Sequence, residues 1–312
     1  MVVYDLCIAW NWAYDADFVS LLEQSCLSRG MTLLQIKPDN LPQMLNMLVG
    51  GEIHCRVFFD RASDVDSQFL PLVQWVSEDA VVSINPYEQA SRTWNKADIH
   101  TMLLVEGLNV PPTIILPPFI EYPELPEMDL GSLGEQFTIK PAHGSGGVGV
   151  MTNATTWNQA LTVRQEHATD HYLLQAHITP VELDSRPAWF RVIFCSGQVF
   201  PCWWNPSNHI YAPVTEAEKL CHHLHALDEI TTSIANLCGL DLFSTEIALN
   251  SDGKFTIVDY VNDQIDLRLQ STTPEGVPDE IVRAVAHQLA CHVEGYACPE
   301  RLPQSKLSKV DR

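Results

Sequence analysis

A glycine-rich segment between two strand-like runs restricts the possible folds of this chain more than any other feature. Residues 137–150 read FTIKPAHGSGGVGV, with glycines recurring from Gly144 to Gly149. The spacing matches the G-x-G-x-x-G of dinucleotide-binding folds, but that motif needs a helix directly after it. Here Val150 and Met151 continue the pattern of a strand, and no Lys-Ser or Lys-Thr pair follows as in a P-loop. The segment therefore predicts a β-hairpin whose glycine loop covers phosphate groups with its backbone N–H donors.

A second predicted hairpin carries two carboxylates. Residues 242–262 contain two strand-like runs around the four-residue loop SDGK. Pairing Asn250 with Phe255 places Glu246 directly opposite Asp259, with their Cβ atoms roughly 5 Å apart. Two such carboxylates repel each other unless a proton or a cation lies between them. Mg²⁺ suits this arrangement because it binds one or two carboxylates together with substrate phosphates, although a solvated acidic strand face is the other interpretation.

Strand and helix patterns alternate through roughly the first 90 residues. Short β-rich runs stand at 2–9, 31–36, 54–60 and 81–84, and helical patterns lie between them at 18–27, 41–49 and 65–76. Alternation of this kind predicts a small parallel α/β unit. No glycine-rich loop follows the first strand, so this unit is not expected to bind a nucleotide by itself.

The middle of the chain begins at a turn signal, the Asn-Pro pair at 85–86. One helix is expected to carry residues 94–103 and to end near Gly107, and a short strand should start around 110–113. The proline-rich stretch 117–126 then predicts a surface excursion ahead of the glycine segment.

Composition limits the classes of partner. The 312 residues include 39 Asp and Glu against 18 Lys and Arg, a formal charge of −21. This excludes binders of duplex nucleic acid or anionic membranes, whereas one phosphorylated small molecule needs only a few local cations. The length predicts two or three subdomains. The nine cysteines are scattered, and neither a signal peptide nor a run of about 18 apolar residues is present, so we expect a cytoplasmic protein with reduced thiols.

One cluster of potential metal ligands stands apart from these motifs. Cys221 and His225 are four residues apart, which places them on one face of a helix, and His222 and His223 lie between them. No second half of a site follows at a ligand-like spacing, so a partly exposed helix is favoured over a metal site.

Taken in order, these motifs resemble the ATP-grasp superfamily from about Asn85 to Gln270, most closely the branch that holds glutathione synthase and the ribosomal-protein glutamate ligases. The resemblance implies an α/β (α+β) fold with three parts: an N-terminal Rossmann-like parallel domain, a small β-rich lid and a C-terminal antiparallel-sheet domain. The expected limits are 1–92, 93–175 and 176–300, followed by a tail at 301–312.

The resemblance also implies a nucleotide site. Lys96 matches the first lysine of the family, Lys140 matches the second, and residues 173–178 match an interdomain hinge that holds adenine through its backbone, with Gln where Glu is more common. Glu182 or Asp184 would hold the ribose. The complete set expected at the nucleotide is Lys96, Lys140, His143, Gly144, Ser145, Gly146, Gly147, Gln175, Ala176, His177, Ile178 and the two ribose candidates Glu182 and Asp184.

Glu246, Asp259 and Asn262 match the metal ligands of the family, implying one or two Mg²⁺ ions with Mn²⁺ as an alternative. The family usually has acid-x-Asn, whereas this chain has one residue more between Asp259 and Asn262. With a period of two, that spacing sends the two side chains to opposite faces of the strand. A bulge at Tyr260 and Val261 would realign them, or Asn262 already lies in the turn.

The groups matched to catalysis are Arg191 at the γ-phosphate and Lys140, with Arg268 as a possible anchor for a substrate carboxylate. Arg268 could equally pair with Asp266 or Asp263. Further candidates for the acceptor pocket, each of which could instead be structural, are Arg186, His209, Tyr211 and the pair Trp203 and Trp204.

The resemblance implies ATP-dependent ligation. A small-molecule or peptide carboxylate takes the γ-phosphate to become an acyl phosphate, and an amine or thiol then displaces phosphate. Two alternatives stay open: a small-molecule kinase, for which no extra cluster of Lys and Arg is evident, and an ATP-binding regulatory or scaffold protein resembling synapsin. The sequence leaves homo-oligomers possible.

Overall fold

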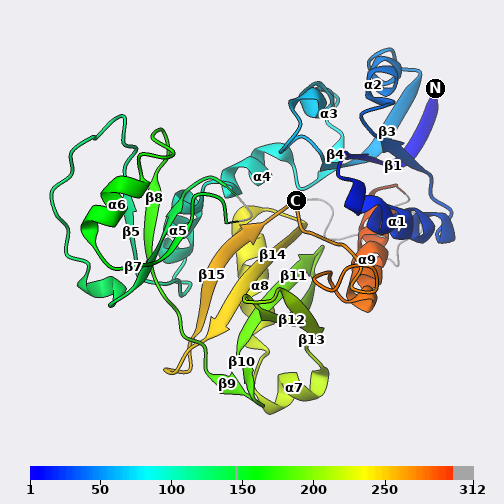
Figure 1. Ribbon diagram of the computed structural model, residues 1–312. Coiled ribbons are helices and arrows are strands. Elements are labelled where there is room, and N and C mark those ends of the chain that lie inside the picture. Colours follow the sequence, from blue (N-terminus) through cyan, green and yellow to red (C-terminus); the bar gives the residue numbers. More distant parts are fainter. Residues whose placement is uncertain (145–146, 298–312) are drawn as a thin grey trace.

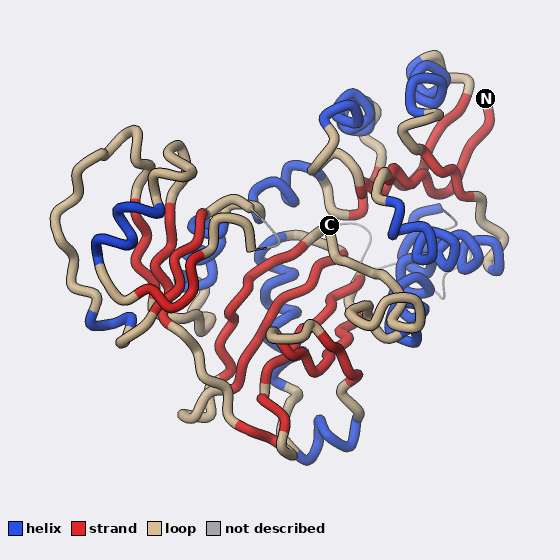
Figure 2. The backbone as a smooth tube through the Cα atoms, viewed as in Figure 1, coloured by secondary structure: helices blue, strands red, loops and turns tan. Residues whose placement is uncertain are grey.

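The computed structural model describes residues 1–144 and 147–297, which form three main sheets with helices packed around them (Figures 1 and 2). The N-terminal sheet is entirely parallel, with the strand order β2-β1-β3-β4. Its elements are β1 (Val2–Trp10), α1 (Ala16–Ser28), β2 (Leu33–Ile36), α2 (Leu41–Val49), β3 (Ile53–Arg61), α3 (Leu70–Glu78) and β4 (Val82–Ile84). The predicted parallel α/β unit is therefore present.

Side chains from strand β1 fill two separate cores. Leu6 and Ile8 pack with α1, whereas Cys7 and Ala9 pack on the opposite face with α2 and α3. This follows from the two-residue period of a strand, and burial of both faces is the normal condition of a parallel sheet.

Two helix predictions need correction. The pattern at 65–76 forms a 3₁₀ turn, Ser67–Phe69, before α3 begins at Leu70. Pro71 explains the late start, because proline is tolerated in the first turn of a helix but not in its interior.

The single helix expected between the Asn-Pro pair at 85–86 and Gly107 is two helices, α4 (Tyr87–Thr93) and α5 (Lys96–Val105). Asn95 interrupts them in an extended conformation, and its side chain accepts hydrogen bonds from the N–H groups of Ala97 and Asp98. An asparagine that caps the start of a helix also ends the one before it.

The lid is an antiparallel sheet with the order β5-β8-β6-β7. Its elements are β5 (Thr113–Leu116), β6 (Phe137–Pro141), β7 (Met151–Ala154), α6 (Trp157–Val163) and β8 (Tyr172–Ala176). The glycine segment is the expected hairpin between β6 and β7, with the return strand starting at Met151.

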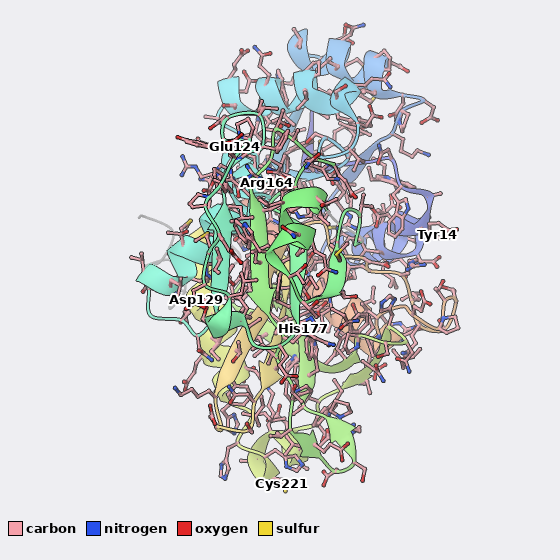
Figure 3. All side chains as sticks on the ribbon, turned by 60° about the vertical axis from the view of Figure 1, so that its left-hand side comes forward. Tyr14, Glu124, Asp129, Arg164, His177 and Cys221 are labelled. Atoms are coloured by element: carbon pink, nitrogen blue, oxygen red, sulfur yellow. The ribbon has the colours of Figure 1, made fainter. Side chains whose placement is uncertain are left out.

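The surface excursion between β5 and β6 is fastened by one buried arginine. Arg164 is fully buried and donates Nη2 to the carbonyl oxygens of Pro117 (2.9 Å) and Tyr122 (2.8 Å), and Figure 3 labels it beside this loop. The excursion therefore belongs to the lid.

The C-terminal sheet is antiparallel with the order β13-β12-β11-β14-β15. Its elements are β11 (Trp189–Cys195), β12 (Gln198–Asn205), β13 (Ile210–Pro213), α7 (Glu216–Cys221), α8 (Ala226–Cys238), β14 (Leu242–Leu249) and β15 (Phe255–Asn262), preceded by the small pair β9 (Glu182–Leu183) and β10 (Arg186–Pro187). The three-part fold class expected from the sequence is confirmed.

The last helix, α9 (Asp279–Ala297), returns to the N-terminal unit and lies beside α1 (Figure 1). Its Val282, Leu289 and Val293 share one core with the N-terminal strands and with β11 and β12. The N-terminal unit and the C-terminal sheet are thus joined by a continuous apolar core. The limits 1–92, 93–175 and 176–300 stay a prediction, and the tail at 301–312 lies outside the described residues.

None of the helices in the described part of the chain is long and apolar enough to cross a membrane.

Candidate functional site

The carboxylate hairpin places Glu246 directly opposite Asp259, as predicted. The pairing near the loop differs from the prediction, because Phe255 pairs with Leu249 and not with Asn250. Asn250 instead closes the loop, its side chain accepting hydrogen bonds from the N–H groups of Asp252 and Lys254. A register shift between Glu246 and Ile247 then restores the facing carboxylates.

A second register shift lies between Glu246 and Ser244. Ser244 pairs with Asn262 while Glu246 pairs with Asp259, so three steps along β15 match two along β14. This is the bulge at Tyr260 and Val261 that the spacing required. Asn262 donates Nδ2 to Asp259 Oδ2 at 2.9 Å, so their side chains meet despite the extra residue.

Glu246 is held from two sides on the C-terminal sheet. Its Oε2 accepts a hydrogen bond from Trp189 Nε1 (3.0 Å), and its Oε1 lies 3.5 Å from Arg191 Nη1. Arg191 occupies the facing position on β11, and its Nε donates to Ser244 Oγ at 3.3 Å. Strand pairing alone therefore brings the guanidinium matched to the γ-phosphate beside the carboxylate matched to the metal.

The two facing carboxylates differ in their titration. Burial and the nearby Asp259 raise the pKa of Glu246, against the opposing effect of Arg191. Burial would also raise the pKa of Asp259, but Lys140 and the hydrogen bond from Asn262 outweigh it and lower that pKa. A buried pair of this kind favours an added positive charge, and hard oxygen ligands favour Mg²⁺.

Two lysines reach this region from the lid side. Burial lowers the pKa of Lys140, and Lys96 lowers it further, while Asp259 and Glu246 oppose that shift. Its Nζ lies 5.4 Å from the centroid of the Tyr260 ring. Lys96, the first residue of α5, donates its Nζ to the carbonyl oxygen of Gly144 at the glycine loop. The two lysines expected at the phosphates therefore lie near the glycine loop and the carboxylates.

His143 fixes the start of the glycine loop. Its N–H and its Nδ1 lie 2.8 and 2.9 Å from the two carboxylate oxygens of Asp170. Gly149 ends the loop at a positive φ of 71°, where a Cβ atom would come within 2.8 Å of His167 Nε2. Gly144 and Gly147 also have positive φ. Ser145 and Gly146, both expected at the nucleotide, lie outside the described residues.

A buried polar network that the sequence did not predict anchors the bulge. The Tyr260 hydroxyl lies 2.6 Å from His100 Nδ1 and accepts a hydrogen bond from Gln175 Nε2 at 2.7 Å. Burial, with a contribution from Lys140, lowers the pKa of His100 to about 4. The network joins α5, β8 and β15. In the sequence, the only signal of this network was Tyr260, which stands between Asp259 and Asn262. Its partners could not be predicted because they are distant in sequence.

The hinge residues lie where β8 leaves the lid. Gln175 turns its side chain inward to Tyr260, Ala176 ends the strand, and Ile178 is half-buried beyond it. His177 is exposed with Nε2 3.0 Å from Thr138 Oγ1, and Figure 3 shows it at the lower edge of the lid. The backbone at this edge is the part matched to adenine.

The two ribose candidates lie on the small β9–β10 pair. Glu182 is exposed on β9. Asp184 occupies the turn with φ of 48°, and its Oδ2 lies 2.7 Å from His222 Nε2. Glu182 is therefore the less encumbered candidate.

The substrate candidates are engaged in structural contacts. Arg268 donates Nε to both oxygens of Asp266 (3.0 and 2.9 Å) and lies 5.6 Å from the ring centroids of Trp12 and Tyr14. Arg186 pairs with Glu218 and lies 4.0 Å over the ring of Trp203.

The Trp pair and the residues near it lie in and beside β12 and β13. Trp203, Trp204 and Tyr211 are buried, and His209 stacks on Trp204. His209 itself is exposed, and Trp204 lies 5.2 Å from the Arg191 guanidinium, so a role of these residues in the acceptor pocket stays a prediction.

Within the described part of the chain, no three His, Cys, Asp or Glu side chains are arranged to hold a metal ion. The cluster around Cys221 therefore does not form such a site, and Cys221 is exposed at the end of α7 (Figure 3). A metal at Glu246 and Asp259 would take further oxygen ligands from Asn262 and from substrate phosphates.

A cavity of about 720 Å³ separates this site from the N-terminal unit. Lys96, His143, Gly144 and Asn262 line one side, so the cavity adjoins the phosphate and metal residues. The N-terminal side includes Arg61, which binds both oxygens of Asp15 (2.9 and 2.7 Å) and the carbonyl oxygen of Ile265. The sequence did not single out these N-terminal residues.

No family model and no curated protein matches this chain by sequence. Solved structures do share its fold. A RimK-domain ATP-grasp protein from Sphaerobacter thermophilus is 16% identical, with 93% of this chain and 100% of that chain covered at a TM-score of 0.62. The D-alanine–D-alanine ligase of Bacillus anthracis, solved with ATP, is 10% identical, with coverage of 96% and 99% and a TM-score of 0.62. The ATP-grasp ligase PsnB, complexed with the precursor peptide PsnA2 and AMPPNP, is 12% identical, with coverage of 95% and 98% and a TM-score of 0.61.

The chain therefore has the ATP-grasp fold, as its motifs predicted. ATP-dependent carboxylate–amine ligases share this fold.

Proposed function

We propose that this protein is an ADP-forming carboxylate–amine ligase that binds Mg²⁺-ATP between the lid and the C-terminal sheet. One observation carries the proposal. Lys140, Arg191, Glu246 and Asp259 come from four strands in two sheets, yet they lie together beside a cavity large enough for substrates. Arg191 Nη1 is 3.5 Å from Glu246, Glu246 faces Asp259, and Lys140 Nζ is 5.4 Å from the ring centroid of the next residue, Tyr260. Buried charges of both signs are costly to a fold, and such sets are concentrated at functional sites.

The chain has a candidate for each part of a nucleotide site. Lys96 and Lys140 would neutralise the phosphates, with N–H groups of the glycine loop, including Gly147, as further donors. The edge at 175–178 would take adenine and Glu182 the ribose. Glu246, Asp259 and Asn262 would hold Mg²⁺, which neutralises phosphate charge when bound. A solved complex of PsnB contains Mg and ADP, which supports this assignment by fold.

The reaction proceeds in two displacements. An oxygen of the substrate carboxylate attacks the γ-phosphorus of ATP, ADP leaves, and an acyl phosphate forms. The amine then attacks the acyl carbon, inorganic phosphate leaves, and the nitrogen loses one proton to give the amide. Arg191 contributes by neutralising charge on the transferred phosphoryl group. Burial would lower its pKa, but Tyr211 and the carboxylates Glu246 and Asp259 outweigh burial and raise it, so Arg191 stays charged throughout.

The acid would lie at the phosphate side of the cavity, beside Lys96, Gly144 and Asn262. Arg268 Nε already donates to both carboxylate oxygens of Asp266. Arg268 could therefore anchor the acid only by binding it and Asp266 at the same time. Solved structures with this fold include complexes with precursor peptides, for PsnB and MdnC, so a peptide carboxylate and a small acid are both candidate substrates.

The test is release of ADP from Mg²⁺-ATP in the presence of pooled amino acids, dipeptides, small organic acids and amines. Wild-type protein should release ADP only with a particular acid and amine. Glu246→Gln should abolish this release, whereas Asp252→Asn, in the exposed loop of the same hairpin, should retain it. Phosphorylation of a hydroxyl compound would instead indicate a kinase. Tight Mg²⁺-ATP binding without turnover in any pool would sink the ligase and favour a regulatory ATP-binding protein.

A further inference from the structure

The cavity beside the site carries more negative than positive charge after the carboxylates that form ion pairs within the protein are set aside. Four aspartates line it, at positions 15, 64, 263 and 266. Asp15 is neutralised by Arg61, and Asp266 is neutralised by Arg268. Lys96 faces the glycine loop, where its Nζ donates to Gly144. Two carboxylates, Asp64 and Asp263, remain on the cavity wall without a cationic partner among the described ion pairs.

Asp263 is the unusual member of this pair. It is only 7% exposed, and its Oδ1 accepts a hydrogen bond from Trp94 Nε1 at 3.1 Å. Its Oδ2 is buried and makes no hydrogen bond within the described part of the chain. An unpartnered buried carboxylate oxygen is costly, and a ligand that donates a hydrogen bond would offset that cost.

Aromatic side chains complete the same wall. Trp94 and Trp12 both line the cavity, and Trp12 contacts Tyr14 edge-on with a centroid separation of 5.2 Å. Aromatic faces beside carboxylates form a favourable environment for an ammonium group, through cation–π attraction and ion pairing together.

We propose that this cavity binds a primary ammonium group between Asp263 and Asp64, with the body of the amine against Trp94 and Trp12. The cavity is thereby selective for cationic amines over neutral or anionic molecules of the same shape. The identification of this amine as the acceptor of the ligase reaction rests on the proposed function. The selectivity of binding does not depend on it.

Arg61 is the group that could reverse this selectivity. Its Nε and Nη2 are bonded to Asp15, and Nη2 also donates to Ile265, but Nη1 makes no hydrogen bond in the part of the chain that the structure describes. A carboxylate ligand would use Nη1. The test must therefore compare a cation with an anion directly.

Three probes of similar shape separate these outcomes: 2-phenylethylamine, 2-phenylethanol and 3-phenylpropanoate. Isothermal titration of the full chain without ATP should show the amine binding at least about tenfold more tightly than the other two, a difference of about 1.4 kcal/mol. Asp263→Asn should remove that preference while keeping the acceptor for Trp94, and Asp64→Asn should reduce it. Asp39→Asn, at an exposed residue that does not line the cavity, should leave it unchanged.

Equal affinity for amine and alcohol would overturn the proposal, and so would tighter binding of 3-phenylpropanoate, which would assign the cavity to an acid held by Arg61. Unchanged amine affinity in a folded Asp263→Asn protein would do the same. If that variant does not fold, the wild-type comparison and Asp64→Asn decide. Because these titrations contain no ATP, their outcome is independent of ADP release: loss of turnover with intact amine selectivity would reject only the ligase.

Discussion

The two hairpins that build the site were both expected from the sequence, yet they are constructed in opposite ways. β14 and β15 are eight residues each, and the carboxylates between them are bonded to Trp189 and Asn262. β6 and β7 have five and four residues, and within the glycine loop the Val148 side chain is 67% exposed.

The difference fits the separate roles proposed for the two hairpins. Metal ligands must be held in fixed relative positions, so the carboxylate hairpin is pinned by side chains from other elements. A backbone that approaches phosphates closely needs conformations that only glycine adopts without strain, so the glycine hairpin gives up side-chain packing. Four predictions test this contrast.

The largest effect is expected for a substitution beside the carboxylate hairpin. Arg191→Met should lower the rate of ADP formation by at least about 100-fold, because a preorganised positive charge at the transferred phosphoryl group is lost. Arg191→Lys should recover only part of the rate, since lysine keeps the charge but not the two-pronged geometry. Steady-state assays with the acid and amine that support wild-type turnover would measure both. A wild-type rate in Arg191→Met would remove Arg191 from the reaction.

The next effect concerns the network that anchors β15. The pKa of His100 is about 4 in the folded protein, because of burial and the nearby Lys140, against about 6.5 when unfolded. Between those values the unfolded chain binds more protons, so the stability contributed by neutral His100 is complete above pH 6.5 and is lost as the pH falls toward 4. The loss amounts to about 3 kcal/mol at most.

Urea unfolding of wild type and His100→Asn at several pH values would measure this contribution. The free-energy difference between the two proteins should move in favour of the variant as the pH falls from 6.5 to 4. A difference that is constant with pH would mean that His100 is not held neutral by the fold.

Tyr260→Phe should destabilise the protein by about 1–3 kcal/mol, since His100 and Gln175 would lose their buried partner. It should also weaken the Mg²⁺-dependent part of ATP binding, because the bulge that aligns Asp259 with Asn262 loses its anchor. Tyr122→Phe, at an exposed tyrosine, is the control. Equal melting temperatures for both variants would show that the network does not support the hairpin.

The smallest effect separates two glycines of the other hairpin. Gly147 and Gly149 have similar positive φ values of 75° and 71°, but only at Gly149 would a Cβ meet His167. Gly147→Ala should cost about 1 kcal/mol from backbone conformation alone. Gly149→Ala should cost about 1 kcal/mol more, from crowding against His167.

Most of that additional cost should disappear when Gly149→Ala is combined with His167→Ala, because only the 3.3 Å approach to Pro141 Cγ then remains. Thermal unfolding of the single and double variants would measure it. Equal destabilisation by the two glycine substitutions would show that crowding against His167 adds no cost.

Local patterns gave much of this architecture. The alternating strands and helices predicted the parallel sheet, and the turn signal at Asn250–Lys254 with the strand spacing predicted that Glu246 faces Asp259. The exact pairing at the loop was wrong by one residue, because Asn250 caps the turn with its own side chain. A compensating shift farther along the strand, which local spacing does not reveal, restored the carboxylate pair.

The features that the sequence did not predict are contacts between segments far apart in the chain. Arg61 and Asp15 are 46 residues apart, and Tyr260 and His100 are 160 apart, so no local pattern links them. The alternative role of Arg268 could be stated from its spacing to Asp266, but only the folded chain shows that this contact is made. Metal, nucleotide and substrate roles come from resemblance and stay proposals.

The most direct test of a joint Mg²⁺-ATP site is calorimetric titration of ATP with and without Mg²⁺, because it needs no knowledge of the acid or the amine. Wild type and Asp252→Asn should bind ATP at least about tenfold more tightly with Mg²⁺, and Glu246→Gln should lose that gain. Failure of the wild-type protein to bind ATP, or a Mg²⁺ effect that persists undiminished in Glu246→Gln, would contradict the account.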